Sequence, residues 1–287
     1  MKRIIYSLYI DIPSEKLDDQ PAYRGDTISK SERTKIELAK NYDKLIQTKK
    51  RYANLVGADF FMYEYDDYIP YYNEMKKKYP QITDYNIINF YKIKLLYDLL
   101  DYDEILYLDF DVVPITNENF FEAWNLSEGI AIAHNNDHIR RNNKKKLDNR
   151  SPTAKHYNCS AMLMDRGLPP SNHVYNTGII GAKSRHLEQL DYFSQFQSNI
   201  DLMDYLVNTP EEGMFPENIS AGFGYDNETL WSYKVEETST PMQWLDEKWH
   251  YFFDNDYIFK DTKFVHAINK KFDHIWKYCE ENNIQYL

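Results

Sequence analysis

A short apolar segment that ends in two aspartates constrains the fold of this chain more than any other feature. The segment YDEILYLDFDVVPI covers residues 102–115, and Asp109 and Asp111 follow its apolar run at 105–108. A continuous apolar run of this length predicts a strand buried on both faces in a parallel sheet. Because side chains alternate along a strand, both carboxylates are expected on one side, at the carboxyl edge where α/β sheets bind ligands. Such close carboxylates repel each other unless a cation or a proton lies between them, so the segment predicts a metal site. Two solvated loop acids are the alternative.

The order of the predicted elements indicates an α/β fold. Strands are expected at 3–12, 58–65 and 105–108, and helices at 31–55 and 85–100 lie between them. Gly57 follows the first helix, and Thr83 or Asp84 is placed to cap the second. This alternation predicts parallel pairing and one three-layer domain over residues 1–287. The other expected elements are polar loops at 13–30 and 67–81, a short helix at 118–125, strands at 129–134 and 174–183, a polar basic stretch at 134–158, a helix at 184–208 and a last helix from Asp273.

Composition excludes several functional classes. The chain has 34 basic and 45 acidic residues, a net charge of −11, which argues against broad binding to nucleic acid or anionic membranes. Cys159 and Cys279 are the only cysteines, so no disulfide framework is indicated. The first residues, MKRIIYSLYIDIP, predict a strand rather than a signal peptide, and no apolar run is long enough to span a bilayer. We expect a cytoplasmic protein.

One lysine departs from the pattern of the helix at 85–100. At 100° per residue, Lys92 falls on the apolar face, among Ile88, Leu95 and Leu99. A lysine on a buried face is costly unless it is paired or its ammonium reaches water. Either the side chain extends to an edge of the core, or its ammonium enters the cleft of the aspartates and meets an anion there.

Three later segments carry further candidate site residues. YNTGIIGA places Asn176 before Gly178, a pattern that also suits a purely structural turn. GFGYDNETLW brings Asp226 and Asn227 together, and helix capping is the competing explanation. VHAINKKFD places His266 before two lysines, Lys270 and Lys271. An imidazole beside two carboxylates would suit Mn²⁺ better than Mg²⁺, and the lysines could screen a diphosphate.

Taken in order, these segments resemble those of nucleotide-sugar-dependent glycosyltransferases of the GT-A fold, nearest to glycosyltransferase family 8. The matching stretches are FYKIKLLYDLL, LYLDFDVVPI, YNTGIIGA, YDNETLW and VHAINKKFD, from about residue 87 onward. The resemblance implies a single Rossmann-like GT-A domain, with a mixed, mostly parallel sheet flanked by helices. It also implies transfer of a sugar from a nucleotide-diphosphate donor, usually a UDP-sugar, to a glycan or other hydroxyl acceptor. Retention at the anomeric carbon and a requirement for Mn²⁺ or Mg²⁺ are implied as well.

The resemblance also implies roles for individual residues. Asp109, Asp111 and His266 would bind the metal, and Asp109 would also contact the ribose. Lys92 would lie near the nucleotide and the donor sugar. The other implied assignments are Asn176, Asp226 and Asn227 around the sugar and the reacting carbon, Ser7, Tyr9 and Asp11 near the base, and Lys270 or Lys271 at the phosphates. The chain departs from the family pattern in two places: Asn227 stands where Gln is usual, and the last motif lacks its glycine and its Lys-Pro-Trp.

Two other functions are compatible with parts of the sequence. ILYLDFDVV also resembles the first motif of haloacid-dehalogenase-type phosphohydrolases, in which Asp109 would be the nucleophile and Asp111 the general acid. That motif usually lies on the first strand of its domain, whereas about a hundred residues precede it here. A non-catalytic sugar-binding relative is the second alternative. The basic segment 138–150 is expected to be a solvated loop or a lid on the acceptor side.

Overall fold

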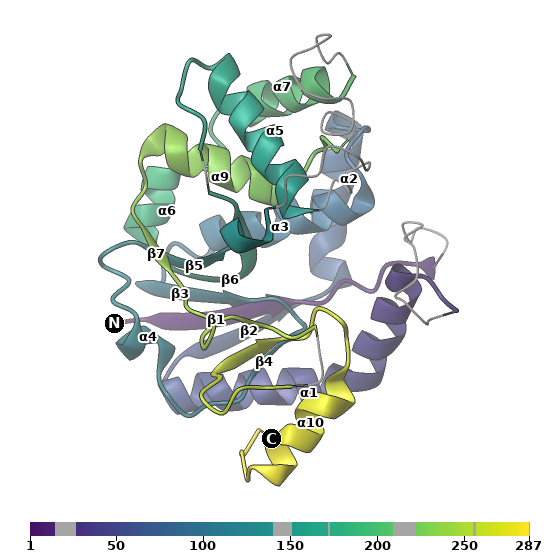
Figure 1. Ribbon diagram of the computed structural model, residues 1–287, viewed down its shortest axis with the longest axis vertical. Helices are drawn as coiled ribbons and strands as arrows, with labels where there is room; N and C mark the ends of the chain where they lie inside the picture. Colours follow the sequence, from purple (N-terminus) through teal and green to yellow (C-terminus); the bar gives the residue numbers. More distant parts are fainter. Residues whose placement is uncertain (15–26, 140–150, 172, 209–221, 255–256, 287) are drawn as a thin grey trace.

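A six-stranded sheet with helices on both faces forms the centre of the molecule (Figure 1). The computed structural model describes residues 1–14, 27–139, 151–171, 173–208, 222–254 and 257–286. The strand order is β2-β1-β3-β6-β5-β7. These strands are β1 (Arg3–Leu8), β2 (Asp59–Tyr63), β3 (Glu104–Leu108), β5 (Ile130–His134), β6 (Tyr175–Lys183) and β7 (Met242–Trp244).

The pairing in this sheet is mixed. Strand β1 pairs in parallel with β2 and β3, as the alternation of strands and helices predicts, and β5 pairs in parallel with β7. Strand β6 is antiparallel to both of its neighbours, β3 and β5. The predicted α/β class with a mixed, mostly parallel sheet is therefore confirmed.

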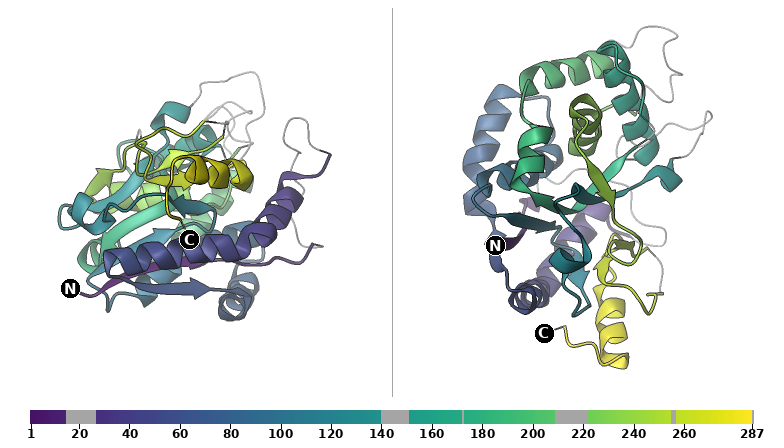
Figure 2. Two further views of the ribbon diagram at one scale, coloured as in Figure 1. Left: turned by 90° about the horizontal axis from the view of Figure 1, so that it is seen from below. Right: turned by 90° about the vertical axis from the view of Figure 1, so that its left-hand side faces the viewer.

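The helices form a layer on each face of the sheet (Figures 1 and 2). One layer consists of α2 (Tyr65–Lys78), α3 (Asp84–Asp98), α5 (Pro152–Asp165), α6 (Ser184–Leu190), α7 (Phe196–Asn208) and α9 (Asn227–Thr238). On the other face lie α1 (Lys30–Val56), α10 (Phe272–Glu281) and a small sheet in the order β4-β9-β8. The remaining elements are β4 (Val112–Pro114), β8 (Tyr251–Phe252), β9 (Phe264–His266), α4 (Phe120–Ala123) and the short 3₁₀ helix η2 (Asn136–His138).

Strand β3 is buried on both faces, as its apolar run predicts. Ile105 and Tyr107 belong to the hydrophobic cluster beneath α3 and α9, whereas Leu106 and Leu108 belong to the cluster on the opposite face. All four side chains are almost completely inaccessible to solvent. Burial of each aliphatic side chain contributes about 1.5–3 kcal/mol, so this strand anchors the sheet beside the two aspartates.

The predicted helix boundaries in the first half of the chain are confirmed within a few residues. Helix α1 begins after Ser29, whose side chain accepts a hydrogen bond from the Glu32 amide, and ends at Gly57 in the left-handed region (φ 68°). Of the two candidates, Thr83 is the residue that caps α3.

Two predictions of local structure are wrong, and a third segment, for which no element was predicted, contains a helix. Residues 67–81, expected to be a polar loop, lie largely in α2, where Glu64 and Asp67 form a capping box and Tyr68 and Met75 are buried. The polar stretch at 134–158 contains the start of α5, whose N-terminus is capped by Ser151. The helix expected at 184–208 is two helices, because Asp191 adopts a left-handed conformation (φ 43°) and ends α6.

Two further expectations concern the basic segment and membrane-spanning helices. Residues 140–150 of the basic segment 138–150 lie outside the described residues. No helix in the described part of the chain is both long and apolar enough to cross a membrane.

Candidate active site

A tight turn, rather than strand alternation, brings the two aspartates together. Strand β3 ends at Leu108, and the Val112 amide donates to the Asp109 carbonyl at 2.9 Å. The chain thus reverses over residues 109–112 and enters β4 of the small sheet. The expectation that both carboxylates lie on the same side is met, but an extended backbone is not the reason.

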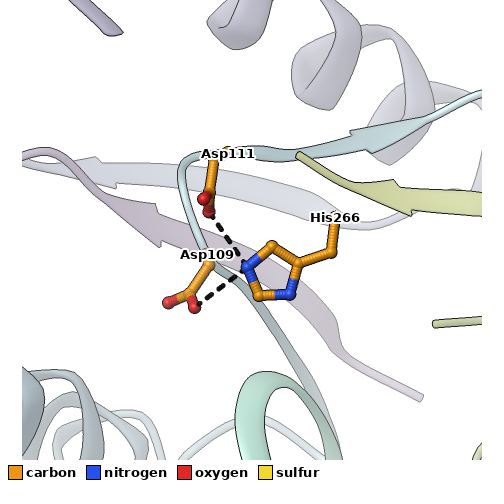
Figure 3. A group of neighbouring side chains, drawn as sticks. All are labelled: Asp109, Asp111 and His266. Carbon is orange, nitrogen blue, oxygen red and sulfur yellow. Dashed lines mark ion pairs between the residues drawn. The ribbon is translucent and has the colours of Figure 1, made fainter. Parts of the chain in front are cut away.

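The third residue of the site, His266, belongs to the small sheet. His266 is the last residue of β9, which pairs antiparallel with β4, so that His266 lies directly opposite Val112. Its Nε2 atom is 3.4 Å from Asp111 Oδ1 and 3.9 Å from Asp109 Oδ2 (Figure 3). One ligand atom from each residue lies within 4.8 Å of the others. Two carboxylates and one imidazole suit a divalent transition ion, so the residues predicted to bind a metal can form one site.

Lys270 and His266 both contact Asp111. Lys270 donates to its Oδ2 atom, and His266 contacts the other oxygen. Burial opposes ionisation of Asp111, but the charge of Lys270 and the contact with His266 outweigh that effect and hold the pKa of this carboxyl well below its usual range. Asp111 is therefore ionised at neutral pH, the state that a metal ligand would need.

Lys92 reaches the other carboxylate. Its side chain is only 5% exposed, and its Nζ atom is 3.4 Å from Asp109 Oδ1. Tyr107, one strand repeat before Asp109, donates its hydroxyl proton to the same oxygen. Of the two interpretations of this lysine, the geometry matches entry into the cleft of the aspartates, where Asp109 is the anion that it contacts. The contact with Asp109 also explains why a lysine lies on the otherwise apolar face of α3, because its ammonium is paired there.

A second buried lysine, Lys49, donates a hydrogen bond to the turn that carries the aspartates. Lys49 of α1 is fully buried and donates to the Phe110 carbonyl, between the two aspartates, at 2.7 Å. Burial lowers the pKa of Lys49 to about 7, against the opposing attraction of Asp111 and Asp109. Its hydrogen bond holds the turn that presents both carboxylates.

The N-terminus of α9 forms another part of the cleft wall. Asp226 caps this helix, because its carboxylate accepts from the Thr229 amide and hydroxyl, so the capping explanation is confirmed. Burial raises the pKa of Asp226, and the positive charge of Lys155 only partly offsets this effect. Asn227 donates to the Thr177 hydroxyl at 2.8 Å. Capping and a role at the site are compatible, because both Asp226 and Asn227 also line the cleft.

One cleft of about 1160 Å³ connects these groups. The predicted site residues that line it are Tyr9, Lys92, Asn176, Asp109, Asp111, Asp226, Asn227, His266 and Lys270. Among the described residues, Ser7, Asp11 and Lys271 are not part of this lining. Ser7 is fully buried and donates to the Leu108 carbonyl, whereas Asp11 forms an ion pair with Lys35 near the surface.

The pairing of β5 with β6 is irregular next to the site. Ile132 of β5 lies opposite Ile180, but the next residue, Ala133, lies opposite Asn176. The intervening residues of β6 therefore bulge away from β5, and the Gly178 carbonyl accepts from the Asp109 amide at 2.8 Å. Asn176 accepts from the Gly178 amide, so the turn-like explanation of this motif also applies.

Substitution of Gly178 tests whether the absence of a side chain at this position is needed for His266 and Asp109 to come together. A Cβ atom at this position would lie 2.6 Å from His266 Cε1 and 3.0 Å from Asp109 Oδ2, too close for either side chain to keep its place. We expect Gly178→Ala to weaken Mn²⁺ binding by at least about tenfold, measured by calorimetry. Gly181→Ala on the same strand is the control, because its Cβ would meet the Phe120 ring in the core. That variant should lower the melting temperature, but folded protein should bind Mn²⁺ normally. Equal Mn²⁺ affinity in both variants would contradict the expectation.

Comparison with known proteins identifies the family. The model of glycosyl transferase family 8 matches residues 27–180, more than half of the chain. The chain belongs to glycosyl transferase family 8. This family 8 protein is thus a glycosyltransferase, and both the predicted resemblance and the GT-A-like α/β fold class are confirmed. The phosphohydrolase alternative is not supported. The match includes α1, β3 with the turn that carries both aspartates, and the start of β6, but not α9 or His266.

Several solved structures are similar to this family 8 chain at low identity. A glycosyltransferase involved in glycosylation of the major capsid of PBCV-1 is 14% identical over 96% of this chain and 100% of that one, with a TM-score of 0.46. Mouse xyloside xylosyltransferase 1 is 12% identical over 93% and 98%, with a TM-score of 0.44. The galactosyltransferase LgtC is 10% identical over 92% and 86%, with a TM-score of 0.48. No curated protein matches the chain.

Sequence reasoning missed four polar side chains around the site of this family 8 protein. Tyr107 could have been found, because strand alternation places it on the same side as Asp109. Lys49, Lys155 and His250 carry no such signal in the sequence, since each reaches the site only through tertiary packing. Lys155 pairs with Glu228 at 2.5 Å, and the Glu228 carboxylate also accepts from the Thr177 amide. His250 contacts His266, and burial keeps the pKa of His250 well below its ordinary value.

Proposed function

We propose that this chain is a metal-dependent hexosyltransferase that uses a nucleotide-diphosphate sugar, with UDP as the nucleotide. The observation that supports this proposal best is the cluster of Asp109, Asp111 and His266 in the lining of a large cleft. A divalent cation, Mn²⁺ or Mg²⁺, would be held by these three side chains and would neutralise charge on the diphosphate.

The remaining cations of the cleft suit the leaving group. In the proposed reaction the bond from the anomeric carbon to the diphosphate breaks, the acceptor hydroxyl oxygen forms the new bond to that carbon, and its proton passes to the departing diphosphate. The transition state resembles an oxocarbenium ion, and negative charge accumulates on the diphosphate. Lys92 and Lys270 both line the cleft beside the aspartates, where they would stabilise that charge. Lys271 stays a further candidate for the phosphates.

Other residues are assigned to the sugar and the base. We assign Asp226, Asn227 and Asn176 to the donor sugar and the reacting carbon, with Asp226 stabilising positive charge on the sugar. Tyr9 is our candidate to stack on the base, because its ring lines the cleft at the carboxyl end of β1 and lies 4.8 Å from the Phe110 ring. Ser7 and Asp11 stay predicted neighbours of the base, although Ser7 would contact it only by giving up its bond to the Leu108 carbonyl.

We further propose that the acceptor is a glycan or another hydroxyl compound, that the anomeric configuration is retained, and that the protein is cytoplasmic. Both cysteines are buried free thiols, which suits a reducing compartment.

A screen of nucleotide sugars tests the proposed function. The full chain is incubated with each nucleotide sugar and Mn²⁺, and release of free nucleotide is measured with and without added glycan acceptors. We expect release from a UDP-hexose that depends on Mn²⁺ and stops when EDTA is added. Mn²⁺-dependent binding without any release or transfer would favour the non-catalytic sugar-binding relative. Hydrolysis of simple phosphoesters without use of nucleotide sugars would reject the proposal. Proton NMR of the product determines whether the configuration is retained.

A further inference from the structure

A second histidine lies directly behind the proposed metal ligand. His250 Nε2 is 2.9 Å from His266 Nδ1, and the two rings are nearly parallel, with an interplanar angle of 24° and centroids 5.2 Å apart. His250 immediately precedes β8, which pairs in parallel with β9 so that Phe252 lies opposite His266. Both imidazoles are buried, with exposed fractions of 2% and 6%. Burial and strand pairing therefore hold the two rings in one arrangement.

The chemistry of two imidazoles restricts where the protons lie. A hydrogen bond between neutral rings needs an N–H on one ring and a lone pair on the other. His266 Nε2 faces both aspartates, so this nitrogen must offer its lone pair if His266 is to bind a cation there. The proton of His266 is then on Nδ1, and His250 Nε2 must accept it. If instead His250 donates, His266 carries its proton on Nε2, and that proton blocks the cation.

The other nitrogen of His250 makes no competing hydrogen bond within the part of the chain that the structure describes. His250 Nδ1 is buried and has no hydrogen-bond partner among the described residues. Among the described residues, the hydrogen bond to His266 is therefore the polar contact that the buried His250 ring makes. A purely apolar side chain would fill the same space without leaving a buried polar atom unsatisfied.

We propose that His250 is a positioning residue that holds His266 in the Nδ1–H tautomer and so sets the affinity of the site for its divalent cation. The proposal rests on the metal-binding role of His266 in the proposed function. Hydrogen-bond partners of metal-bound histidines typically change metal affinity by 10- to 100-fold when they are removed.

Mn²⁺ titration of two variants provides the test. His250→Phe keeps a planar ring but offers no acceptor, and we expect its dissociation constant for Mn²⁺, measured by calorimetry, to rise by about 10- to 100-fold. His250→Gln keeps an acceptor oxygen and should recover most of the affinity. His186→Phe is the matched control: His186 is also buried but does not line the cleft, so Mn²⁺ affinity should not change. Wild-type affinity in a folded His250→Phe variant would overturn the proposal.

A second measurement needs no variant. In ¹⁵N-labelled wild-type protein saturated with diamagnetic Mg²⁺, the ring nitrogens of His266 should show a protonated Nδ1 and an unprotonated Nε2. A cation-bound protein with the proton of His266 on Nε2 would refute the role of His250. Failure of the wild-type protein to bind either cation is a different result, because it rejects the metal site of the proposed function itself.

Discussion

Asp111→Asn is expected to reduce sugar transfer by on the order of 10³-fold or more at every Mn²⁺ concentration. Asp111 is nearly buried, contacts both His266 and Lys270, and is held in its ionised form by them. An amide at this position keeps the shape but removes the negative charge and one ligand oxygen. The measurement is the initial rate of nucleotide release across a Mn²⁺ series that reaches well above saturation of the wild-type protein.

Asp98→Asn is the matched control for this experiment. Asp98 lies on the exposed face of α3, where it pairs with Lys94, and it does not line the cleft. Its replacement should leave the rate unchanged. Substantial transfer by a folded Asp111→Asn variant, or recovery of its rate at high Mn²⁺, would contradict the assignment of Asp111 as an essential ligand.

Lys155→Met is expected to lower the free energy of unfolding by about 3–5 kcal/mol, because it leaves the Glu228 carboxylate buried without its cation. The two side chains are 2.5 Å apart, with exposed fractions of only 14% and 9%. Burial opposes the charge on each residue. Even so, Lys155 and Lys92 together hold the pKa of Glu228 below its usual value. Urea denaturation at neutral pH measures the difference.

The double variant Lys155→Met/Glu228→Gln separates charge from packing. The glutamine oxygen can still accept from the Thr177 amide, while no uncompensated charge remains. We therefore expect it to recover much of the lost stability. Equal stability of the single and double variants would show that the charge of Glu228 is not the cause. Lys94→Met, which breaks the exposed pair with Asp98, should change the stability by no more than about 0.5 kcal/mol.

The sign of the pH dependence follows from the depressed pKa of Glu228. Its ionised form stabilises the wild-type protein above the ordinary pKa of a glutamate, and that contribution is lost as the pH falls through the lower, folded-state pKa. In Lys155→Met the uncompensated carboxylate favours the protonated form instead. The difference between the two proteins should therefore shrink as the solution becomes acidic.

Local patterns predicted much of the fold and part of the site. Apolar run length identified β3, helical periodicity with Ser29 and Gly57 at its ends identified α1, and the helical wheel placed Lys92 on a buried face. The polar helix α2 was missed because few of its side chains are buried. The break at Asp191 was missed because a left-handed aspartate carries no periodic signal. The extent of a single domain over residues 1–287 stays a prediction.

The sequence alone determined which chemistry is present: two aspartates after a buried strand, a lysine on the wrong face of the preceding helix, and a histidine far downstream. These signals are local, because they depend on side-chain periodicity and on short spacings. Only the tertiary structure decided which groups meet. His266 reaches Asp111 through the pairing of β9 with β4, Lys49 reaches the Phe110 carbonyl from α1, and His250 reaches His266 through β8. The physical reason is that strand register and helix packing join residues from 16 to more than 150 positions apart, and no local preference encodes such contacts.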